Sequence, residues 1–192
     1  MKKIAIFASG SGTNAQRIIE YFKDHPLIRI EMILSNNPEA FVLERAKKLN
    51  LASLVFSRQE FYQSDMVLKV LQENNITFII LAGFLWLIPK YLLDAYSRKI
   101  INIHPALLPK YGGKGMYGMR VHEAVIQAGE KESGISIHFV NEKYDAGQKI
   151  FQVKCEVSEK DTPETLAKKI HLLEYQYFPV IIEKVLLKGK SF

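Results

Sequence analysis

The chain has 192 residues, 48% of them hydrophobic and 24% charged, so we expect one compact domain over residues 1–192 rather than a disordered or fibrous protein. The formal net charge of +6 favours anionic partners. The lysines are scattered without interleaved aromatic residues, which indicates small anionic ligands and no nucleic acid.

Apolar runs and cysteine usage restrict the setting further. No apolar run approaches the roughly 18 residues that cross a bilayer, so we expect no membrane contact. The single cysteine, Cys155, has no partner for an internal disulfide, and no Cys/His cluster has zinc spacing. These features predict a cytoplasmic protein without a metal ion.

In the first half of the chain, strand-like apolar runs alternate with amphipathic helical stretches. The pattern predicts a parallel sheet with right-handed crossovers and helices on both faces, a Rossmann-like doubly wound α/β fold. Ligands of such folds bind at the carboxyl ends of the strands. We expect strands at residues 3–9, 28–35, 54–56 and 77–82, and helices from about residue 14, over 39–50 and over 59–74.

The second half should contain an antiparallel portion and a long C-terminal helix. We expect a short helix after Pro89, a strand at 99–103, a glycine-rich loop at 111–118, a helix at 119–128 and strands at 133–140 and 149–157. The last helix should start at Asp161 or Thr162, with Pro163 in its first turn. Pro179 should kink it or end its first segment, and its apolar stripe should comprise Leu166, Ile170, Leu173 and Tyr177.

The first expected strand leads into Gly10-Ser11-Gly12-Thr13-Asn14 and then a helix. Backbone amides at a helix N-terminus bind phosphate. The turn lacks the dinucleotide-binding glycine pattern, because Ala15 occupies the third glycine position, and it is not a Walker A loop. The pattern therefore favours a phosphate site, with a plain strand-to-helix turn as the structural alternative.

Asn102 and His104 lie at the end of an expected strand, where period-two alternation places them on one face. In a cleft, these side chains can stabilise an oxyanion and handle a proton. The structural alternative is a satisfied core histidine beside a turn-capping asparagine. Asp145, in a polar loop before Gly147, is by itself only a turn aspartate.

The other histidines give weaker signals. His138 alternates with apolar residues on an expected strand, which predicts burial beside the site rather than direct catalysis. His25, His122 and His171 are expected to be surface or structural residues.

The segment 102–109, the strand 136–140 and the loop to Asp145 together resemble the folate-dependent formyltransferase superfamily. Residues 10–14, Ser35-Asn36, residues 81–84 and Glu174 narrow the resemblance to its glycinamide ribonucleotide formyltransferases, over nearly the whole chain. Such enzymes move a formyl group from 10-formyltetrahydrofolate to the amine of glycinamide ribonucleotide in purine biosynthesis. The resemblance implies these two small-molecule substrates, no metal, and a monomer or homodimer.

The resemblance also implies roles for individual residues. The substrate amine would attack the formyl carbon while His104 and Asn102 stabilise the oxyanion, and Asp145 would support the histidine and help to relay the proton. The ribonucleotide would contact Gly12, Thr13, Asn14 and Glu174. The folate would contact Arg58, Leu85, Trp86, Leu87, Ile88 and Asn102, with the pterin receiving hydrogen bonds from backbone between Asn141 and Asp145.

Three features depart from the family pattern. After the Ala-Gly-Phe segment, where many members have an arginine or lysine, this chain has apolar residues that include Trp86. The glycine-rich loop 112–118 is longer than usual, and Ile135 stands where threonine or cysteine is frequent, which leaves the hydroxyl role to Ser136.

Three other functions compete with this interpretation. A formyltetrahydrofolate deformylase would use the same trio with water as nucleophile, but would need an additional N-terminal domain that we do not expect here. A tRNA or sugar-nucleotide formyltransferase would normally carry an extra C-terminal domain. A non-enzymatic nucleotide-binding module on the same fold is the rival from another class, and the intact trio of Asn102, His104 and Asp145 argues against it.

Overall fold

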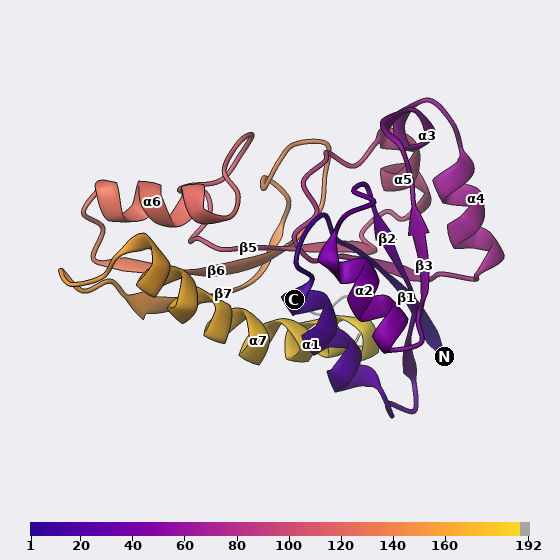
Figure 1. Ribbon diagram of the computed structural model, residues 1–192, viewed down its shortest axis with the longest axis horizontal. Coiled ribbons are helices and arrows are strands. Elements are labelled where there is room, and N and C mark those ends of the chain that lie inside the picture. Colours follow the sequence, from indigo (N-terminus) through magenta and orange to yellow (C-terminus); the bar gives the residue numbers. More distant parts are fainter. Residues whose placement is uncertain (189–192) are drawn as a thin grey trace. The chain divides into compact units, whose positions relative to one another are not determined.

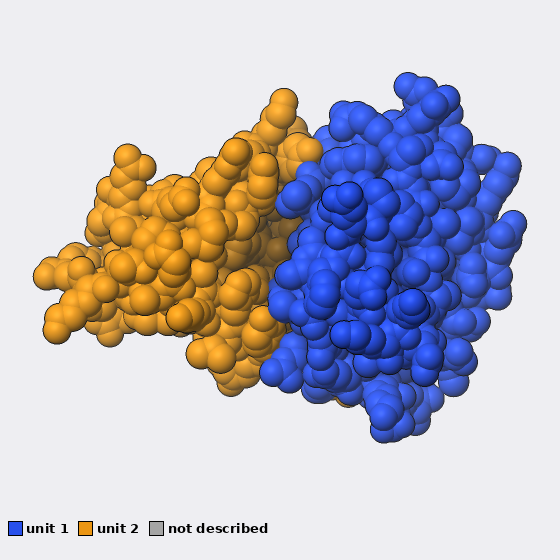
Figure 2. Space-filling model, in the orientation of Figure 1, with its two compact units in different colours: residues 1–101 blue, residues 102–192 orange. Residues whose placement is uncertain are grey.

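The structure is a computed structural model that describes residues 1–188 of the chain. The chain forms two compact units, residues 1–101 and residues 102–192 (Figure 2). Seven strands and seven helices lie within the described residues, and the sheet has the strand order β3-β2-β1-β4-β5-β6-β7. The last four residues of the predicted 1–192 domain lie outside the described residues.

The first unit is the parallel part of the fold. Its strands are β1 (Lys2–Phe7), β2 (Ile28–Ser35), β3 (Ala52–Val55) and β4 (Phe78–Leu81). β1 pairs in parallel with both β2 and β4, and β2 pairs in parallel with β3. All four residues of β4 are buried, as are the last four of β1, because helices cover both faces of a parallel sheet.

The helices of the first unit lie on both sides of these strands (Figure 1). α1 (Thr13–Phe22) and α2 (Phe41–Lys48) contact each other and β2 on one side. The other side carries α3 (Arg58–Tyr62), α4 (Met66–Glu73) and α5 (Lys90–Ala95). The doubly wound arrangement predicted from the alternation of strands and helices is confirmed.

One long helix expected over residues 59–74 is in fact two, α3 and α4. A capping box starts α3, because Ser57 and Glu60 each accept a hydrogen bond from the other's backbone N–H. Ser64 Oγ lies 2.8 Å from the Glu60 carbonyl oxygen and accepts from Met66 N at 3.2 Å. This local side-chain bonding competes with the helical pattern and separates the two helices.

The boundary between the two units falls within β5 (Ile100–His104), because the second unit begins at Asn102. The second unit continues with α6 (Met119–Gln127), β6 (Glu132–Phe139) and β7 (Lys149–Glu156). β6 and β7 are antiparallel, as predicted, and their register shifts between Ile137 and His138. The final helix, α7 (Pro163–Lys188), packs against β6, β7 and α6.

The structure decides between the two alternatives expected at Pro179 and corrects the expected apolar stripe. Pro179 does not end the helix, since α7 continues to Lys188, with Phe178 and Ile182 buried on either side of the proline. The buried stripe is Leu166, Ile170, Glu174 and Phe178, at steps of four residues, whereas Leu173 and Tyr177 are only half-buried. Glu174 was expected beside the buried face of the helix, and it lies on that face.

Candidate active site

The end of β5 positions the two central polar side chains. Ile101 and Ile103 are buried on one face of the strand, and Asn102 and His104 alternate with them. His104 is 4% exposed, whereas Asn102 is half-buried. A buried histidine needs partners for both ring nitrogens, and they come from the loops after β5 and β6.

His104 has an acceptor at each ring nitrogen. Nε2 lies 2.7 Å from the carbonyl oxygen of Tyr111, and Nδ1 lies 3.5 Å from Oδ2 of Asp145. Burial lowers the pKa of His104, and it outweighs the opposing effects of the Asp145 carboxylate and the Tyr111 carbonyl. The carboxylate is thus the main local group that favours the protonated ring.

Asp145 adopts a left-handed backbone conformation, with a φ of 53°, which is uncommon for a residue other than glycine. Its Oδ2 accepts a hydrogen bond of 2.9 Å from the backbone N–H of Gly113. Burial alone would raise the pKa of this carboxyl group, but contacts with His138, His104 and the Gly113 N–H outweigh it, so the pKa lies below its ordinary value. Asp145 is therefore ionised at neutral pH.

Asn102 connects the strand to this carboxylate. Its Nδ2 lies 3.1 Å from Nε2 of His138 and donates to Oδ1 of Asp145 at 3.3 Å. His138 is 2% exposed, and its Nε2 lies 3.6 Å from the same carboxylate oxygen. The expected burial of His138 beside the site is confirmed, and its direct contact with Asn102 is an addition.

A hydroxyl group and an amide brace the backbone that follows His104. Ser136 Oγ donates to the carbonyl oxygen of Ala106 at 2.6 Å and accepts from the N–H of Leu108 at 2.9 Å. Gln152 Nε2 donates to Ser136 Oγ at 2.7 Å and to the Leu108 carbonyl oxygen at 3.0 Å. Ser136, to which the sequence assigned the hydroxyl role, therefore holds this turn with a buried hydroxyl group. Its neighbour Ile135 is fully buried.

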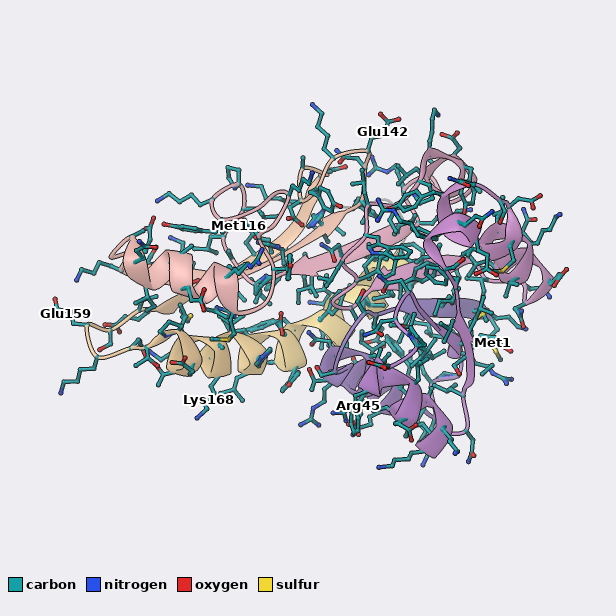
Figure 3. All side chains as sticks on the ribbon, turned by 45° about the horizontal axis from the view of Figure 1, so that its top comes forward. Met1, Arg45, Met116, Glu142, Glu159 and Lys168 are labelled. Carbon is teal, nitrogen blue, oxygen red and sulfur yellow. The ribbon has the colours of Figure 1, made fainter. Side chains whose placement is uncertain are left out.

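The glycine-rich loop between β5 and α6 packs closely on Asp145. A Cβ added to Gly112 would lie 3.2 Å from the Cβ of Asp145 and 2.5 Å from a methyl group of Leu108, so a larger residue there would displace the Leu108 side chain. Figure 3 labels Met116 in this loop and Glu142 in the loop between β6 and β7, the two segments that supply Gly113 and Asp145.

Glu174 is 5% exposed on the core face of α7 and accepts from a neighbouring histidine. Its Oε2 lies 2.9 Å from Nδ1 of His171, and this hydrogen bond raises the pKa of the histidine. His122, on α6, is buried at 3% exposure, which lowers its pKa, and its Nδ1 has no hydrogen-bond partner among residues 1–188. Both histidines were predicted to be surface or structural residues. His171 is half-exposed and lies at the surface, whereas His122 is buried in the interior.

In the first unit, the glycine turn after β1 precedes α1 as predicted. Gly12 is the N-terminal cap of α1, with a left-handed φ of 71°. A Cβ added to it would lie 2.6 Å from the Cβ of Val42 and 2.9 Å from its Cα, so only glycine fits. The first N–H groups of a helix have no partner within the helix, and α1 begins at Thr13. Arg45 Nε donates to the Ser11 carbonyl oxygen at 2.7 Å and adds a positive charge beside the turn.

Among the residues of the first unit that were expected to contact the folate, Arg58 lies over two aromatic rings. The guanidinium carbon of Arg58 lies 5.1 Å from the ring centre of Tyr62 and 5.6 Å from that of Trp86. Tyr62 donates to the carbonyl oxygen of Leu87 at 2.9 Å. Leu85 is 43% exposed, whereas Ile88 is buried.

Asn102, His104 and Asp145 therefore come together as predicted. Three partners of this trio were not foreseen: the carbonyl of Tyr111, the N–H of Gly113 and the ring of His138. The first two are backbone groups, and the type of residue that carries them gives no signal of the contact. Within residues 1–188, no three His, Cys, Asp or Glu side chains gather so that they could hold a metal ion, and no helix is long and apolar enough to span a membrane.

The sequence profile of the formyl transferase family matches residues 2–182. The chain belongs to the formyl transferase family. It is 36% identical over 191 residues to the phosphoribosylglycinamide formyltransferase of Bacillus subtilis, covering 97% of this chain and 95% of that protein. It is 38% identical over 187 residues to the chloroplastic enzyme of Arabidopsis thaliana, covering 94% of this chain, and it spans only 64% of the length of that relative.

Solved structures of formyl transferase family members agree with the fold. The phosphoribosylglycinamide formyltransferase from Bacillus halodurans superposes with a TM-score of 0.87 at 36% identity, covering 98% of this chain and 97% of that one. The resemblance drawn from residues 102–109, 136–145 and the glycine turn is confirmed. The fold is confirmed with it: a mostly parallel sheet, an antiparallel C-terminal portion and a long last helix.

Proposed function

We propose that this chain transfers the formyl group of 10-formyltetrahydrofolate to the amine of glycinamide ribonucleotide, giving formylglycinamide ribonucleotide and tetrahydrofolate in purine biosynthesis. The gathering of Asn102, His104 and Asp145 at the end of β5, in a member of the formyl transferase family, carries this proposal. The family profile runs through both compact units, which supports one formyltransferase domain over residues 1–192.

The reaction needs a group that stabilises negative charge on the formyl oxygen. The amine nitrogen attacks the formyl carbon, the bond from that carbon to the folate nitrogen breaks, and one proton moves from the amine to the folate nitrogen. In the tetrahedral intermediate, the oxygen is an oxyanion that requires a hydrogen-bond donor. His104 serves as this donor when its Nε2–H exchanges the Tyr111 carbonyl for the formyl oxygen.

Asp145 supports His104 electrostatically. Its oxygens face the Gly113 N–H, the Asn102 amide and the two histidines, and its pKa lies below the ordinary value. A carboxylate with a low pKa is a weak base, so this environment favours charge stabilisation of the histidine ring over storage of the proton.

The ribonucleotide contacts are proposed in each unit separately. In the first unit, the N–H groups after Gly12 at the start of α1 suit the phosphate, with Thr13 and Asn14 toward the phosphate and ribose. In the second unit, the buried carboxylate of Glu174 suits the ribose hydroxyls or the glycinamide. A buried carboxylate gains most from hydrogen-bond donors, and both groups supply them.

The folate contacts follow the same division. In the first unit, Arg58 supplies a cation for the carboxylates of the folate, while Leu85, Trp86, Leu87 and Ile88 supply apolar surface and backbone groups for the pterin. In the second unit, Asn102 and the backbone from Asn141 to Asp145 would complete the pterin contacts. A cytoplasmic location and a monomeric or homodimeric state also stay predictions.

An assay of formyl transfer tests the function. Purified protein is incubated with 10-formyltetrahydrofolate, with and without glycinamide ribonucleotide, and both the formylated ribonucleotide and free formate are measured. We expect ribonucleotide-dependent product and no formate. Formate release that does not depend on the ribonucleotide would indicate the deformylase reaction instead, and the absence of either product would indicate a binding module.

A further inference from the structure

Ser9 lies just after β1, at the place in the first unit where the order of the strands reverses. The chain runs from β1 to β2 and β3 on one side of β1 and then returns to β4 on its other side. In open α/β sheets, ligands bind beside the carboxyl ends of the two strands that flank such a reversal. Here those strands are β1 and β4, and Ser9 is the first polar residue after β1.

The hydroxyl group of Ser9 takes the place of a backbone carbonyl between these two strands. The N–H of Ser9 donates to the carbonyl oxygen of Gly83 at 3.0 Å. In a parallel ladder, the N–H of Leu85, two residues further on, would then donate to the Ser9 carbonyl. It donates instead to Ser9 Oγ, at 3.0 Å. The side chain therefore continues the ladder by one step beyond the backbone pairing.

Ser9 also contacts the loop that follows β2. Because an N–H only donates, Oγ is the acceptor for Leu85, and the hydroxyl hydrogen is left for Oδ1 of Asn36, 2.7 Å away. The Ser9 carbonyl oxygen accepts from Nδ2 of Asn37 at 3.4 Å. Ser9 is 8% exposed, so these contacts are largely shielded from water. One buried residue thus connects the loops after β1, β2 and β4.

Two of these loops contain proposed substrate contacts. The glycine turn, residues 10–14, begins at the residue after Ser9 and leads into α1. Leu85 is the first residue of the segment 85–88, which is proposed to contact the pterin. The side chain of Leu85 is 43% exposed, whereas its N–H is bonded to Ser9. The start of this segment is therefore held by its backbone, and its spacing from the glycine turn depends on the Ser9 hydroxyl.

We propose that Ser9 is a positioning residue whose hydroxyl couples the two loops, so that a phosphate in the glycine turn strengthens folate binding at the segment 85–88. A phosphate that orders the turn also orders the hydroxyl at its start, and less freedom is then lost when the folate orders the segment. The coupling is reciprocal, because each ligand changes the affinity for the other by the same factor. The identity of the two ligands rests on the proposed function, whereas the contact between Ser9 and Leu85 does not.

The turn after β4 has a second anchor that does not involve Ser9. Gly83 has a left-handed φ of 76°, a conformation that glycine adopts without steric cost. The next side chain, Phe84, is buried and packs edge-on against Phe7, with 5.4 Å between the ring centres. Because this packing stays when the Ser9 hydroxyl is removed, we expect Ser9→Ala to fold and to lose only the contact with Leu85 and Asn36.

Amide NMR of the protein with inorganic phosphate as the probe tests the coupling. We expect phosphate to shift the signals of Gly12 and Leu85 with one Kd. In Ser9→Ala the shift at Gly12 should remain and that at Leu85 should be lost, and the Leu85 N–H should exchange about tenfold faster without its acceptor. An unchanged exchange rate would overturn the contact, and a Leu85 signal that does not follow phosphate in the wild type would overturn the coupling. No shift at Gly12 either would contradict the proposed phosphate site as well.

Calorimetry separates coupling from folding. Tetrahydrofolate, which has no formyl group to transfer, is titrated into the protein with and without saturating glycinamide ribonucleotide. The ribonucleotide should tighten this binding by about fivefold or more in the wild type and leave it unchanged in Ser9→Ala. Ser9→Thr keeps the hydroxyl and should restore most of the effect, and Ser53→Ala, at an exposed position of β3, should match the wild type.

Two outcomes of this titration would contradict the proposal. One is the same coupling factor in the wild type and in Ser9→Ala. The other is a Ser9→Thr variant with the melting temperature of the wild type but no coupling, because the hydroxyl would then have no part in it. If the transfer assay showed no product, the proposed function would fail, whereas the exchange rate of the Leu85 N–H would still decide the contact with Ser9.

Discussion

Nδ1 of His104 lies 3.5 Å from Oδ2 of Asp145, and the second ring nitrogen is held at 2.7 Å by the Tyr111 carbonyl. Burial lowers the pKa of His104, and Asp145 is the largest effect that opposes it. The carboxylate therefore sets how readily the buried ring takes up a proton.

Asp145→Asn removes this charge and should lower the pKa of His104 further below its ordinary value of 6.5. An NMR titration of the His104 ring measures the pKa directly, and Glu142→Gln, an exposed residue of the same loop, is the control that should leave it unchanged. An unaltered His104 titration in Asp145→Asn would mean that the two groups are not coupled.

Asn102→Ala and His104→Ala should each lower kcat strongly in a folded protein. Loss of one oxyanion donor costs about 10²–10³ in turnover. Substrate affinity should stay within a small factor. Single-turnover rates and melting curves distinguish this from a structural role, which would lower stability and activity together, and full activity of a well-folded His104→Ala variant would exclude the mechanism.

The Arg58 guanidinium lies 5.6 Å from the ring centre of Trp86, the only tryptophan of the chain, so its fluorescence reports on this place alone. Arg58→Ala should change the emission and weaken folate binding, because a cation near the ring is lost. Arg29→Ala removes an arginine that pairs with Glu31 on β2 and should change neither. Wild-type folate affinity in Arg58→Ala would remove this residue from the site.

The sequence predicted those parts of the fold in which local pattern and burial agree. The apolar run predicted as a strand over residues 77–82 forms β4, Phe78–Leu81, in which every side chain is buried. The split of the helix expected over residues 59–74 and the missing Glu174 in the buried stripe of α7 have a common cause: the polar side chains of Ser64 and Glu174 gain partners that the pattern does not show. Ser64 bonds to its own helix end, and Glu174 lies on the core face with His171 beside it.

The side chains of the candidate site could be predicted from the sequence, but the backbone groups that contact them could not. Asn102, His104 and Asp145 were found from strand-end placement and family resemblance. Their backbone partners at Tyr111 and Gly113 were not, because a carbonyl or N–H contact depends on the path of the loop rather than on residue type. The contact of 3.1 Å between Asn102 Nδ2 and His138 Nε2 was not predicted either, because His138 lies on another strand.

The ion pair of His171 and Glu174 should make stability depend on pH in a defined direction. The hydrogen bond to Glu174 raises the pKa of His171 above its ordinary value of 6.5. Its stabilisation is therefore fully present below pH 6.5 and is lost as the pH rises through the raised pKa. Glu174→Gln should be less stable than the wild type at low pH, and the difference should narrow at high pH.

Denaturant unfolding at several pH values measures this difference. His171→Gln should abolish the pH-dependent part of it, since the titrating group is gone. If Glu174 also contacts the ribonucleotide, Glu174→Ala should raise the KM for the ribonucleotide more than that for folate. A constant stability difference across the pH range would contradict the ion pair, and an equal rise of both KM values would indicate a general folding defect.

Gly12 allows the backbone of the glycine turn to approach a ligand, and its substitution should weaken ribonucleotide binding. At a φ of 71°, a residue with a Cβ is strained by roughly 1–2 kcal/mol. The added atoms would also collide with Val42, whose Cβ would lie 2.6 Å from the new Cβ. Gly12→Val therefore displaces the first N–H groups of α1, which are the proposed phosphate donors.

A matched control separates this effect from backbone strain alone. Gly129 has a similar φ of 63°, but nothing lies within 4 Å of a Cβ built on it, and it is remote in sequence from the turn. Gly129→Val should lower the melting temperature through strain while leaving ribonucleotide affinity unchanged. Calorimetry on both variants, below their melting temperatures, should show weaker ribonucleotide binding for Gly12→Val only. Wild-type affinity in Gly12→Val would exclude the turn as the phosphate site, because no backbone donor there could keep its position beside the enlarged residue.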